Sequence, residues 1–441
     1  MSYVNYFSRP HLYLRNLCGT LGQFGLFGLL LVSSLITPLS AQQLFIPMDE
    51  RQANHLKAYG LIFNHLTEGG KATWLLNYRG GSFMTDENAA LVREARLKNI
   101  TIEVISSSQA TRITQDVESP GSNTSVVNLE KAPRIAVYTP NQALPWDDAV
   151  TLALSYAEID YDKIWDVEVL QGGLQNYDWL HLHHEDFTGQ YGKFWASYRN
   201  NPWYITQVKQ MEAMATELGF NKVSDQKLAV AKTIKEYVGK GGFLFAMCSG
   251  TDTFDVALAA EGIDIAPTPF DGDPVDPNAQ ESLDYSATLA FENFTISLNP
   301  AEYEHADIDV PVAINEIDQT LDFFTLFEFS AKWDPVPTML TQNHVSSVRG
   351  FSGQTTAFRS DKIKSSVVVL GESPGREQAK YIHGTFGQGT YTFYAGHDPE
   401  DYTHRVNDPP TDLALHPNSP GYRLILNNIL FPAAKKKKQK T

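Results

Sequence analysis

The chain has little cysteine and no excess of positive charge, and each shortage excludes a class of protein. Only two cysteines, Cys18 and Cys248, occur among 441 residues. The formal net charge at pH 7 is −16, so no basic face can neutralise phosphates, and nucleic acid is not expected as a partner. The sequence has no P-loop, no Gly-x-Gly-x-x-Gly fingerprint and no Gly-x-Ser-x-Gly elbow. No organic cofactor is therefore expected.

Long apolar runs are also scarce, and the run near the amino end resembles a leader. Arg9 and Arg15 precede an apolar core at 24–36 that ends in small residues, which predicts a secretory signal peptide over 1–41. The core is shorter than the roughly 20 residues that span a bilayer, and no second hydrophobic span follows. We therefore expect no transmembrane segment after cleavage, and a location that is secreted, periplasmic or at the cell surface. Cleavage would leave Cys248 without a partner for an intramolecular disulfide.

Residues 44–106 alternate between strand and helix patterns. Apolar runs at 44–48, 73–78 and 100–105 predict strands, and the stretches 50–66 and 87–99 between them have helical spacing. This order predicts an N-terminal βαβαβ unit with parallel strands and crossover helices. The polar segment that follows contains SPGSNTS, so 107–132 is predicted to be a linker or exposed loop.

A second α/β run fills residues 133–432. It is predicted to form a flavodoxin-like parallel sheet with flanking helices, decorated by an irregular, acidic insertion at 262–345. Two strands joined by a turn at Gly387-Gln388-Gly389 are expected over 381–396, and a last helix over 422–430. The basic residues of 433–441 are interpreted as a solvated tail.

Cys248 ends the apolar run GFLFAMC and is followed at once by a helical pattern from Thr251. A strand, a sharp turn and a helix place the turn residue at the carboxyl edge of a parallel sheet, where open α/β sheets bind ligands. The amino end of the next helix can also stabilise a thiolate. Cys248 is thus a candidate nucleophile, with backbone N–H groups at Ser249 and Gly250 as candidate oxyanion donors. The alternative is a buried, inert cysteine at a strand end.

The stretch YAGHDPED supplies a candidate base and acid at another strand end. A cysteine nucleophile needs a base, and the base needs a carboxylate that fixes its tautomer. His397 and Glu400 have these chemistries within one turn. The alternative is a cluster at a helix start, with Asp398 as the cap.

The stretch HLHHED at 181–186 is a third candidate site. Alternate residues of a strand share a face, so His181, His183 and Glu185 are expected to point the same way and could bind zinc or another divalent ion. The alternative is a polar end to a buried strand. Because this strand also points to the carboxyl edge, Glu185 or His184 could instead line the Cys248 pocket.

The order of these motifs resembles that of class I glutamine amidotransferase-like domains over about residues 130–430. The resemblance implies a flavodoxin-like sheet with a Cys–His–Glu triad, in which Cys248 matches the nucleophile, His397 the base and Glu400 the acid. Here Ala246-Met247-Cys248-Ser249-Gly250 keeps only the later glycine of the usual Gly-x-Cys-x-Gly elbow. The ending GHDPEDY is more similar to the trehalose-utilisation (ThuA-like) branch of that fold.

The whole chain also resembles a family of secreted bacterial proteins described as asparagine synthetase B. The resemblance rests on NHLKAYG (54–60), WLLNYRGGSF (74–83), WLHLHHEDFTGQYGKF (179–194) and KWDPVPTMLTQNH (332–344). The ATP-binding pattern Ser-Gly-Gly-x-Asp-Ser of true synthetases is not present, and Ser2 follows the initiator methionine where those enzymes have cysteine. ATP-dependent synthetase chemistry is therefore not expected.

The leading hypothesis is a secreted enzyme that cleaves an amide or related acyl bond through a thioester on Cys248, with His397 as base, assisted by Glu400 or Glu185. One alternative is a ThuA-like module that binds a carbohydrate or other small ligand without turnover, using Trp146, Trp179, Trp195 and Trp203 for stacking. The other is a metal-dependent hydrolase centred on His181, His183 and Glu185.

Overall fold

The computed structural model describes residues 42–141, 144–310, 322–350, 354–401 and 405–434. The predicted signal peptide and nearly all of the basic tail lie outside these residues. These residues form one compact unit that contains two sheets. None of the helices in the described ranges combines the length and apolar character needed to cross a membrane.

The first sheet has five strands in the order β4-β1-β3-β2-β5, and every neighbouring pair is antiparallel. Its elements are β1 (Gln42–Ile46), α1 (His55–Thr67), β2 (Ala72–Leu76), β3 (Ser82–Asp86), α2 (Ala89–Leu97), β4 (Glu103–Ser106), α3 (Ser107–Glu118) and β5 (Ser125–Leu129). The prediction of a parallel βαβαβ unit was therefore wrong. The chain reverses after β2 because Asn77, Arg79, Gly80 and Gly81 all have positive φ, so β3, which the sequence pattern did not reveal, returns beside β2.

The predicted linker over 107–132 also forms regular structure. Ser106 begins α3 with a capping box, in which its hydroxyl accepts from the Gln109 amide and the Gln109 side chain accepts from the Ser106 amide. β5 then pairs with β2 at the edge of the sheet. SPGSNTS is only the short turn between these two elements, so the two sheets are not separated by a linker of that length.

The second sheet has ten strands, of which five form a parallel half in the order β7-β6-β8-β9-β15. The elements of this half are β6 (Ile135–Tyr138), α4 (Ala149–Ala157), β7 (Asp162–Ile164), α5 (Asp166–Leu170), β8 (Trp179–Leu182), α6 (Trp195–Tyr198), α7 (Pro202–Glu217), α8 (Val223–Gly239), β9 (Phe243–Met247), α9 (Ser249–Ala259) and β15 (Gly389–Tyr394). The strands and helices expected in this region are present.

The other strands of this sheet pair antiparallel, so the predicted parallel sheet is present only as one part of a mixed α/β sheet. Gly387, with φ 59°, reverses the chain between two strands as expected, which makes the hairpin antiparallel. Beyond it the sheet continues through strands that only pair antiparallel. These elements are β10 (Phe323–Leu326), α11 (Pro335–Leu340), β11 (Ser347–Arg349), β12 (Phe358–Arg359), β13 (Val368–Ser373) and β14 (Gln378–Phe386).

The predicted insertion is only partly irregular. Residues 262–310 contain the short helix α10 (Thr268–Asp271), two single 3-10 turns and isolated bridges. Residues 323–340 instead supply β10 and α11, and β10 pairs with β11 and β13. The 3-10 turns of the described residues are η1 (Gly173–Asn176), η2 (Tyr191–Lys193), η3 (Gln280–Ser282), η4 (Tyr285–Ala287), η5 (Ser360–Lys362), η6 (Leu413–Leu415) and η7 (Phe431–Ala433).

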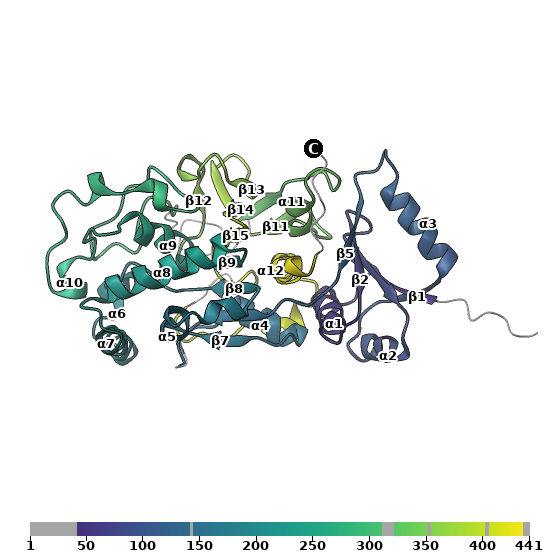
Figure 1. Cartoon of the computed structure of the whole chain (residues 1–441), viewed down its shortest axis with the longest axis horizontal. Coiled ribbons are helices and arrows are strands. Elements are labelled where there is room, and N and C mark those ends of the chain that lie inside the picture. Colours follow the sequence, from purple (N-terminus) through teal and green to yellow (C-terminus); the bar gives the residue numbers. More distant parts are fainter. Residues whose placement is uncertain (1–41, 142–143, 311–321, 351–353, 402–404, 435–441) are drawn as a thin grey trace, which may run out of the picture. The chain divides into compact units, whose positions relative to one another are not determined.

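Helices cover both faces of the parallel half (Figure 1). Phe243, Phe245 and Met247 of β9 pack in one apolar cluster with α4 and α12 (Pro420–Leu430), whereas Leu244 and Ala246 pack in a second cluster with α5, α8 and α9. The alternation follows from the two-residue period of a strand. Burial on both faces explains why the strand is an unbroken apolar run.

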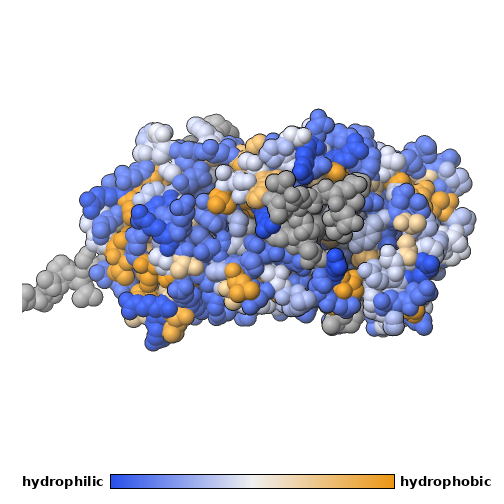
Figure 2. All heavy atoms as spheres, turned by 180° about the vertical axis from the view of Figure 1, so that it is seen from behind, coloured by the Kyte–Doolittle hydropathy of each residue, from blue (hydrophilic) through white to orange (hydrophobic). Residues whose placement is uncertain are grey.

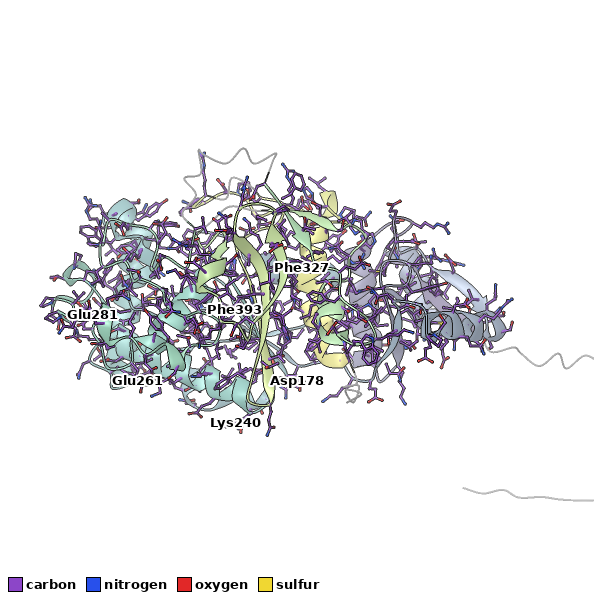
Figure 3. The ribbon with its side chains drawn as sticks, turned by 90° about the horizontal axis from the view of Figure 1, so that it is seen from above. Asp178, Lys240, Glu261, Glu281, Phe327 and Phe393 are labelled. Atoms are coloured by element: carbon purple, nitrogen blue, oxygen red, sulfur yellow. The ribbon has the colours of Figure 1, made fainter. Side chains whose placement is uncertain are left out.

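The side-chain view agrees with this layering. Phe393 of β15 is fully buried among the inner side chains, whereas Lys240 and Glu261, at the ends of helices, project outward (Figure 3). Figure 2 shows a largely hydrophilic face on which apolar side chains form small groups.

Candidate functional site

Four parallel strands direct their carboxyl ends to the same edge of the second sheet. The loop after β6 leads to Asp147 and Asp148, β8 leads to His183 and His184, and β9 leads to Cys248. β15 leads through Gly396 to His397, and the Cys248 amide donates to the Gly396 carbonyl (3.1 Å). The edge therefore gathers Cys248, His397 and the histidines of HLHHED, which the sequence pattern singled out as separate candidates.

Three histidine rings lie against one another at this edge. The ring centroids are 3.4 Å apart for His183 and His184, 3.8 Å for His184 and His397, and 4.4 Å for His183 and His397. One nitrogen from each ring can be chosen so that all three lie within 4.8 Å of one another, and Nε2 of His397 contacts Nε2 of His184. His183 and His397 are buried and His184 is half-buried. This is a donor set that a zinc-type ion takes.

Asp148 supports the same cluster from the start of α4. Its Oδ2 lies 3.1 Å from Nε2 of His181 and 3.4 Å from Nδ1 of His183. Its Oδ1 accepts from the amides of Val150 and Thr151 as the helix N-cap. Burial by itself raises the pKa of Asp148, but His181 and the Thr151 amide outweigh it and hold that pKa below its ordinary value.

The predicted metal triad of His181, His183 and Glu185 is not the set that the fold brings together. β8 ends at Leu182, so the strand alternation that would align Glu185 with the histidines stops before it. His181 and His183 meet at Asp148 instead. Glu185 lines a small cavity of about 20 Å³ together with His184, Trp146 and Asp186. Burial raises the pKa of the Glu185 carboxyl to about 8, although Lys227 opposes the shift.

Cys248 has the backbone of an elbow but not the surroundings of an activated thiol. Its φ of 50° and ψ of −141° are strained for a residue with a side chain, as at the nucleophile turn between a strand and a helix. Its side chain is 2% exposed, and Sγ lies 3.1 Å from the Gln354 carbonyl, to which it donates. Burial raises the pKa of this thiol well above its ordinary value, with the charges of Asp252 and Asp309 adding to the effect.

Of the two expected oxyanion donors, the Gly250 amide has another partner in the described structure, whereas the Ser249 amide donates to Cys248 itself. The Gly250 amide donates to the His183 carbonyl (3.1 Å). The Ser249 hydroxyl donates to the His184 carbonyl (2.9 Å). Both contacts tie the start of α9 to the end of β8, so they position the histidines rather than leave the Gly250 amide directed at a ligand.

Glu400 does not pair with His397 in the way that the resemblance implies. Its carboxylate lies 3.3 Å from Nδ1 of His416. The turn after His397 is fixed by Asp398, whose Oδ1 accepts from the Glu400 amide (2.8 Å) and whose Oδ2 accepts from the Tyr422 hydroxyl (2.5 Å). Asp398 thus fixes a turn, and no helix starts at it in the described residues, so the alternative of a helix cap was wrong.

The tryptophans considered for carbohydrate stacking divide into two sets. Trp179 is fully buried in the sheet and stacks on Phe245, so it offers no surface. Trp146, Trp195 and Trp203 are half-buried, and Trp146 contacts Trp203, Phe194 and His184 with ring centroids 5.5 Å apart in each pair. An aromatic group therefore borders the histidine cluster.

Sequence reasoning missed the grouping of His184 and His397 and the part played by Asp148. The pattern placed His184 beside the cysteine pocket, and Asp148 looked like an ordinary residue at the start of a helix. One signal in the sequence could have revealed the grouping. Asp148, His184 and His397 all follow predicted strands of the second α/β run, and the carboxyl ends of parallel strands lie at the same edge of a sheet.

Comparisons with known proteins identify no family for this chain. No family model matches it, and no curated protein matches it. Among solved structures, two cytoplasmic proteins from Salmonella typhimurium are similar at TM-scores of 0.34 and 0.33, with 10% and 14% identity, over 69% and 68% of this chain and all of theirs. A β-galactosidase from Bacillus circulans sp. alkalophilus has a TM-score of 0.26 and 11% identity, over 60% of this chain and 29% of its own. At such scores these similarities support no argument about fold or function.

Proposed function

We propose that this chain is a metal-dependent hydrolase of a small amide or related acyl substrate, with the ion held by His183, His184 and His397. The observation that carries the proposal is the packing of three imidazoles from two different strand ends, with a nitrogen of each within 4.8 Å of the others. Three histidines are a known ligand set of catalytic zinc, and an ion so bound leaves a position for water or substrate. The ion would supply a polarised water at neutral pH.

The position of the site supports a catalytic centre. In chain order the parallel strands β7-β6-β8-β9-β15 follow the pattern 2-1-3-4-5 of flavodoxin-like sheets, which bind ligands outside the carboxyl ends of the strands where the order reverses. That reversal lies between β6 and β8, which lead to Asp148 and to the histidines. This order also supports the finer proposal of a flavodoxin-like half within the mixed sheet.

Glu185 is the carboxyl group best placed to assist a hydrolysis. It follows His184 directly, and both line the cavity of about 20 Å³, which is large enough for one water. A carboxyl group beside a metal-bound water is the usual arrangement for moving the proton of that water. We also propose that the enzyme is exported, because residues 1–41 have the pattern of a signal peptide.

Metal binding tests the proposal directly. We expect protein stripped with EDTA to bind Zn²⁺ or Co²⁺ in calorimetry. We expect His397→Ala to weaken that binding by more than about 100-fold, because loss of an outer partner alone costs about 10–100-fold. His65→Ala is the matched control, since His65 lies on α1, beside Thr85 of the first sheet. Absence of Zn²⁺ and Co²⁺ binding would overturn the proposal. Hydrolysis of p-nitrophenyl acetate and of glutamine p-nitroanilide should then require the ion.

A second candidate, the cysteine hydrolase, is favoured by one observation, the strained elbow at Cys248. The two candidates predict opposite results for Cys248→Ser. A metal hydrolase should keep its rate on the same substrates, whereas a cysteine enzyme should lose it while remaining folded. Retained Zn²⁺ binding with no turnover of either substrate would instead favour the small-ligand binding module.

A further inference from the structure

The described residues contain two overlapping groups that could take an ion at this edge. His183 belongs to both, since it groups with His184 and His397 on one side and with Asp148 and His181 on the other. The two groups could hold two ions or one. The hydrogen bonds of the second group decide between these arrangements.

The Asp148 carboxylate is already fully engaged. Oδ1 accepts from the Val150 amide at 2.7 Å and from the Thr151 amide at 3.0 Å. Oδ2 faces Nε2 of His181 at 3.1 Å and Nδ1 of His183 at 3.4 Å. A carboxylate offers about four lone-pair sites, so these four contacts use its capacity. The helix N-cap also fixes its position, which leaves it little freedom to turn toward an ion.

His181 is likewise held by its neighbours. Its Nδ1 lies 3.2 Å from the Phe245 carbonyl of β9 and its Nε2 lies 3.1 Å from Oδ2 of Asp148, and the residue is fully buried. Both nitrogens are therefore directed at protein oxygens. Neither is directed at His184 or His397.

His183 connects the two groups. Because Nδ1 of its ring faces Asp148, Nε2 is the nitrogen left for an ion shared with His184 and His397. A carboxylate that holds the distal nitrogen of a metal-bound histidine fixes its tautomer and its orientation.

We infer, on the basis of the proposed function, that the site takes one metal ion rather than two, and that Asp148 is a positioning residue that orients the His183 ring without binding the ion. His181 then belongs to the support of Asp148 and not to the ligand set. The strand pattern predicted His181 as a metal ligand, and the inference gives it a supporting role instead.

The test compares metal binding by the wild-type chain, Asp148→Asn and Asp148→Ser, with calorimetry and the visible absorption of bound Co²⁺. We expect the wild-type chain to bind one ion. Both variants should still bind one ion, but about 10–100-fold more weakly and with a shifted Co²⁺ spectrum, because the His183 ring loses its carboxylate partner. Ser keeps a side-chain oxygen that can cap α4. A loss of metal affinity that both variants share therefore does not result from loss of the helix cap.

The possible failures are distinguishable. Two ions per wild-type chain, or variants with unchanged affinity and spectrum, would overturn the inference and leave the proposed function standing. Absence of binding by the wild-type chain would overturn both. Asn88→Ala is the control for the general loss of stability that follows from removing a helix cap. Asn88 caps α2, which lies beside the first sheet, so this variant should leave Co²⁺ binding unchanged.

Discussion

At the scale of single residues, Cys248 combines a strained backbone with a protected side chain. Its amide donates to the Gly396 carbonyl and its thiol donates to the Gln354 carbonyl. The Gln354 side chain is itself anchored, since its Nε2 donates to the carbonyls of Tyr303 (2.6 Å) and Gly192 (3.2 Å). The strain is thus offset by contacts from two other segments of the chain, one of which is itself held in place.

We predict that native Cys248 reacts slowly with iodoacetamide at neutral pH and up to about pH 9, because burial keeps the thiol protonated and shielded. Reaction should become fast in urea. Gln354→Ala should raise the native rate, because it frees the segment that covers the sulfur. Mass spectrometry of timed samples gives these rates. Fast alkylation of the native wild-type protein with an apparent pKa below the usual 8.5 would favour the cysteine hydrolase instead.

A buried carboxyl near the elbow should make stability depend on pH. Burial raises the pKa of Asp309 from 3.8 to about 7, although the amides of Thr355 and Thr356 donate to it. The folded state therefore holds a proton that the unfolded state releases above about pH 4. The free energy of unfolding then falls as pH rises from about 4 to 7 and changes little from this group beyond that.

Asp309→Asn should remove that slope. Relative to the wild-type chain, the variant should gain stability between pH 4 and pH 7, by at most about 4 kcal/mol, the equivalent of the full shift. Urea unfolding at a series of pH values measures this difference. Asp307→Asn is the control, because Asp307 is half-buried and pairs with Lys362. A wild-type slope that persists in Asp309→Asn would contradict the assignment.

At the scale of elements, close contact between α1 and α4 depends on Gly60. A Cβ placed there would lie 1.9 Å from the Ala157 carbonyl oxygen, a backbone atom that cannot move aside by itself. Gly in a helix interior normally costs about 1 kcal/mol relative to Ala. The glycine lowers the intrinsic stability of α1 by about that amount, but it allows α1 and α4 to come into direct contact.

We expect Gly60→Ala to destabilise the protein by about 1–3 kcal/mol, as overpacking of an interior does, in spite of its better helix propensity. Gly121→Ala is the matched control, since nothing lies within 4 Å of a Cβ at that position and the change should stay within about 0.5 kcal/mol. Thermal unfolding followed by circular dichroism measures both. A stabilised Gly60→Ala would show that α1 and α4 can separate at no cost.

At the scale of the whole molecule, the buried helix α12 joins the two sheets. Arg423 is fully buried; its Nη1 donates to the Met48 carbonyl (2.8 Å), its Nη2 to the Gly80 carbonyl and its Nε to the Tyr59 hydroxyl (3.3 Å). From the same helix, Asn427 donates to the carbonyls of Leu340 (3.0 Å) and Gln342 (2.8 Å). One apolar cluster also runs through both sheets.

Arg423→Met should lower the free energy of unfolding by about 3 kcal/mol or more, because it leaves the Met48 and Gly80 carbonyls buried without this donor. Urea unfolding of the wild-type chain should show a single transition, since the sheets share a core. Arg134→Ala, at an exposed arginine, is the control and should change stability by no more than about 0.5 kcal/mol. Two separate transitions in the wild-type chain would show that the sheets are independent domains.

The sequence by itself determined most local structure of the second sheet. The apolar run before Cys248 forms β9, Gly387 makes the predicted hairpin turn, and Ser419 caps the predicted last helix. The strand is recognised by its apolar run, the turn by a glycine that adopts a left-handed backbone, and the helix start by a capping side chain. Each of these signals lies within a few residues of the chain, so a local pattern is sufficient to reveal it. Local sequence patterns also predicted that Cys248, His183 and His397 lie at the ends of strands.

Only the tertiary structure decided which of these strand ends meet and which side chains face one another. Glu400 is three residues from His397 but pairs with His416, and His181 shares a predicted face with Glu185 but meets Asp148. The order β6-β8-β9-β15 brings residues 183 and 397 together across more than 200 positions. Such contacts depend on pairing between strands that are distant in the sequence, and no local period of the sequence encodes that pairing. For the same reason the sequence pattern did not reveal the chain reversal after β2, which makes the first sheet antiparallel where a parallel sheet was expected.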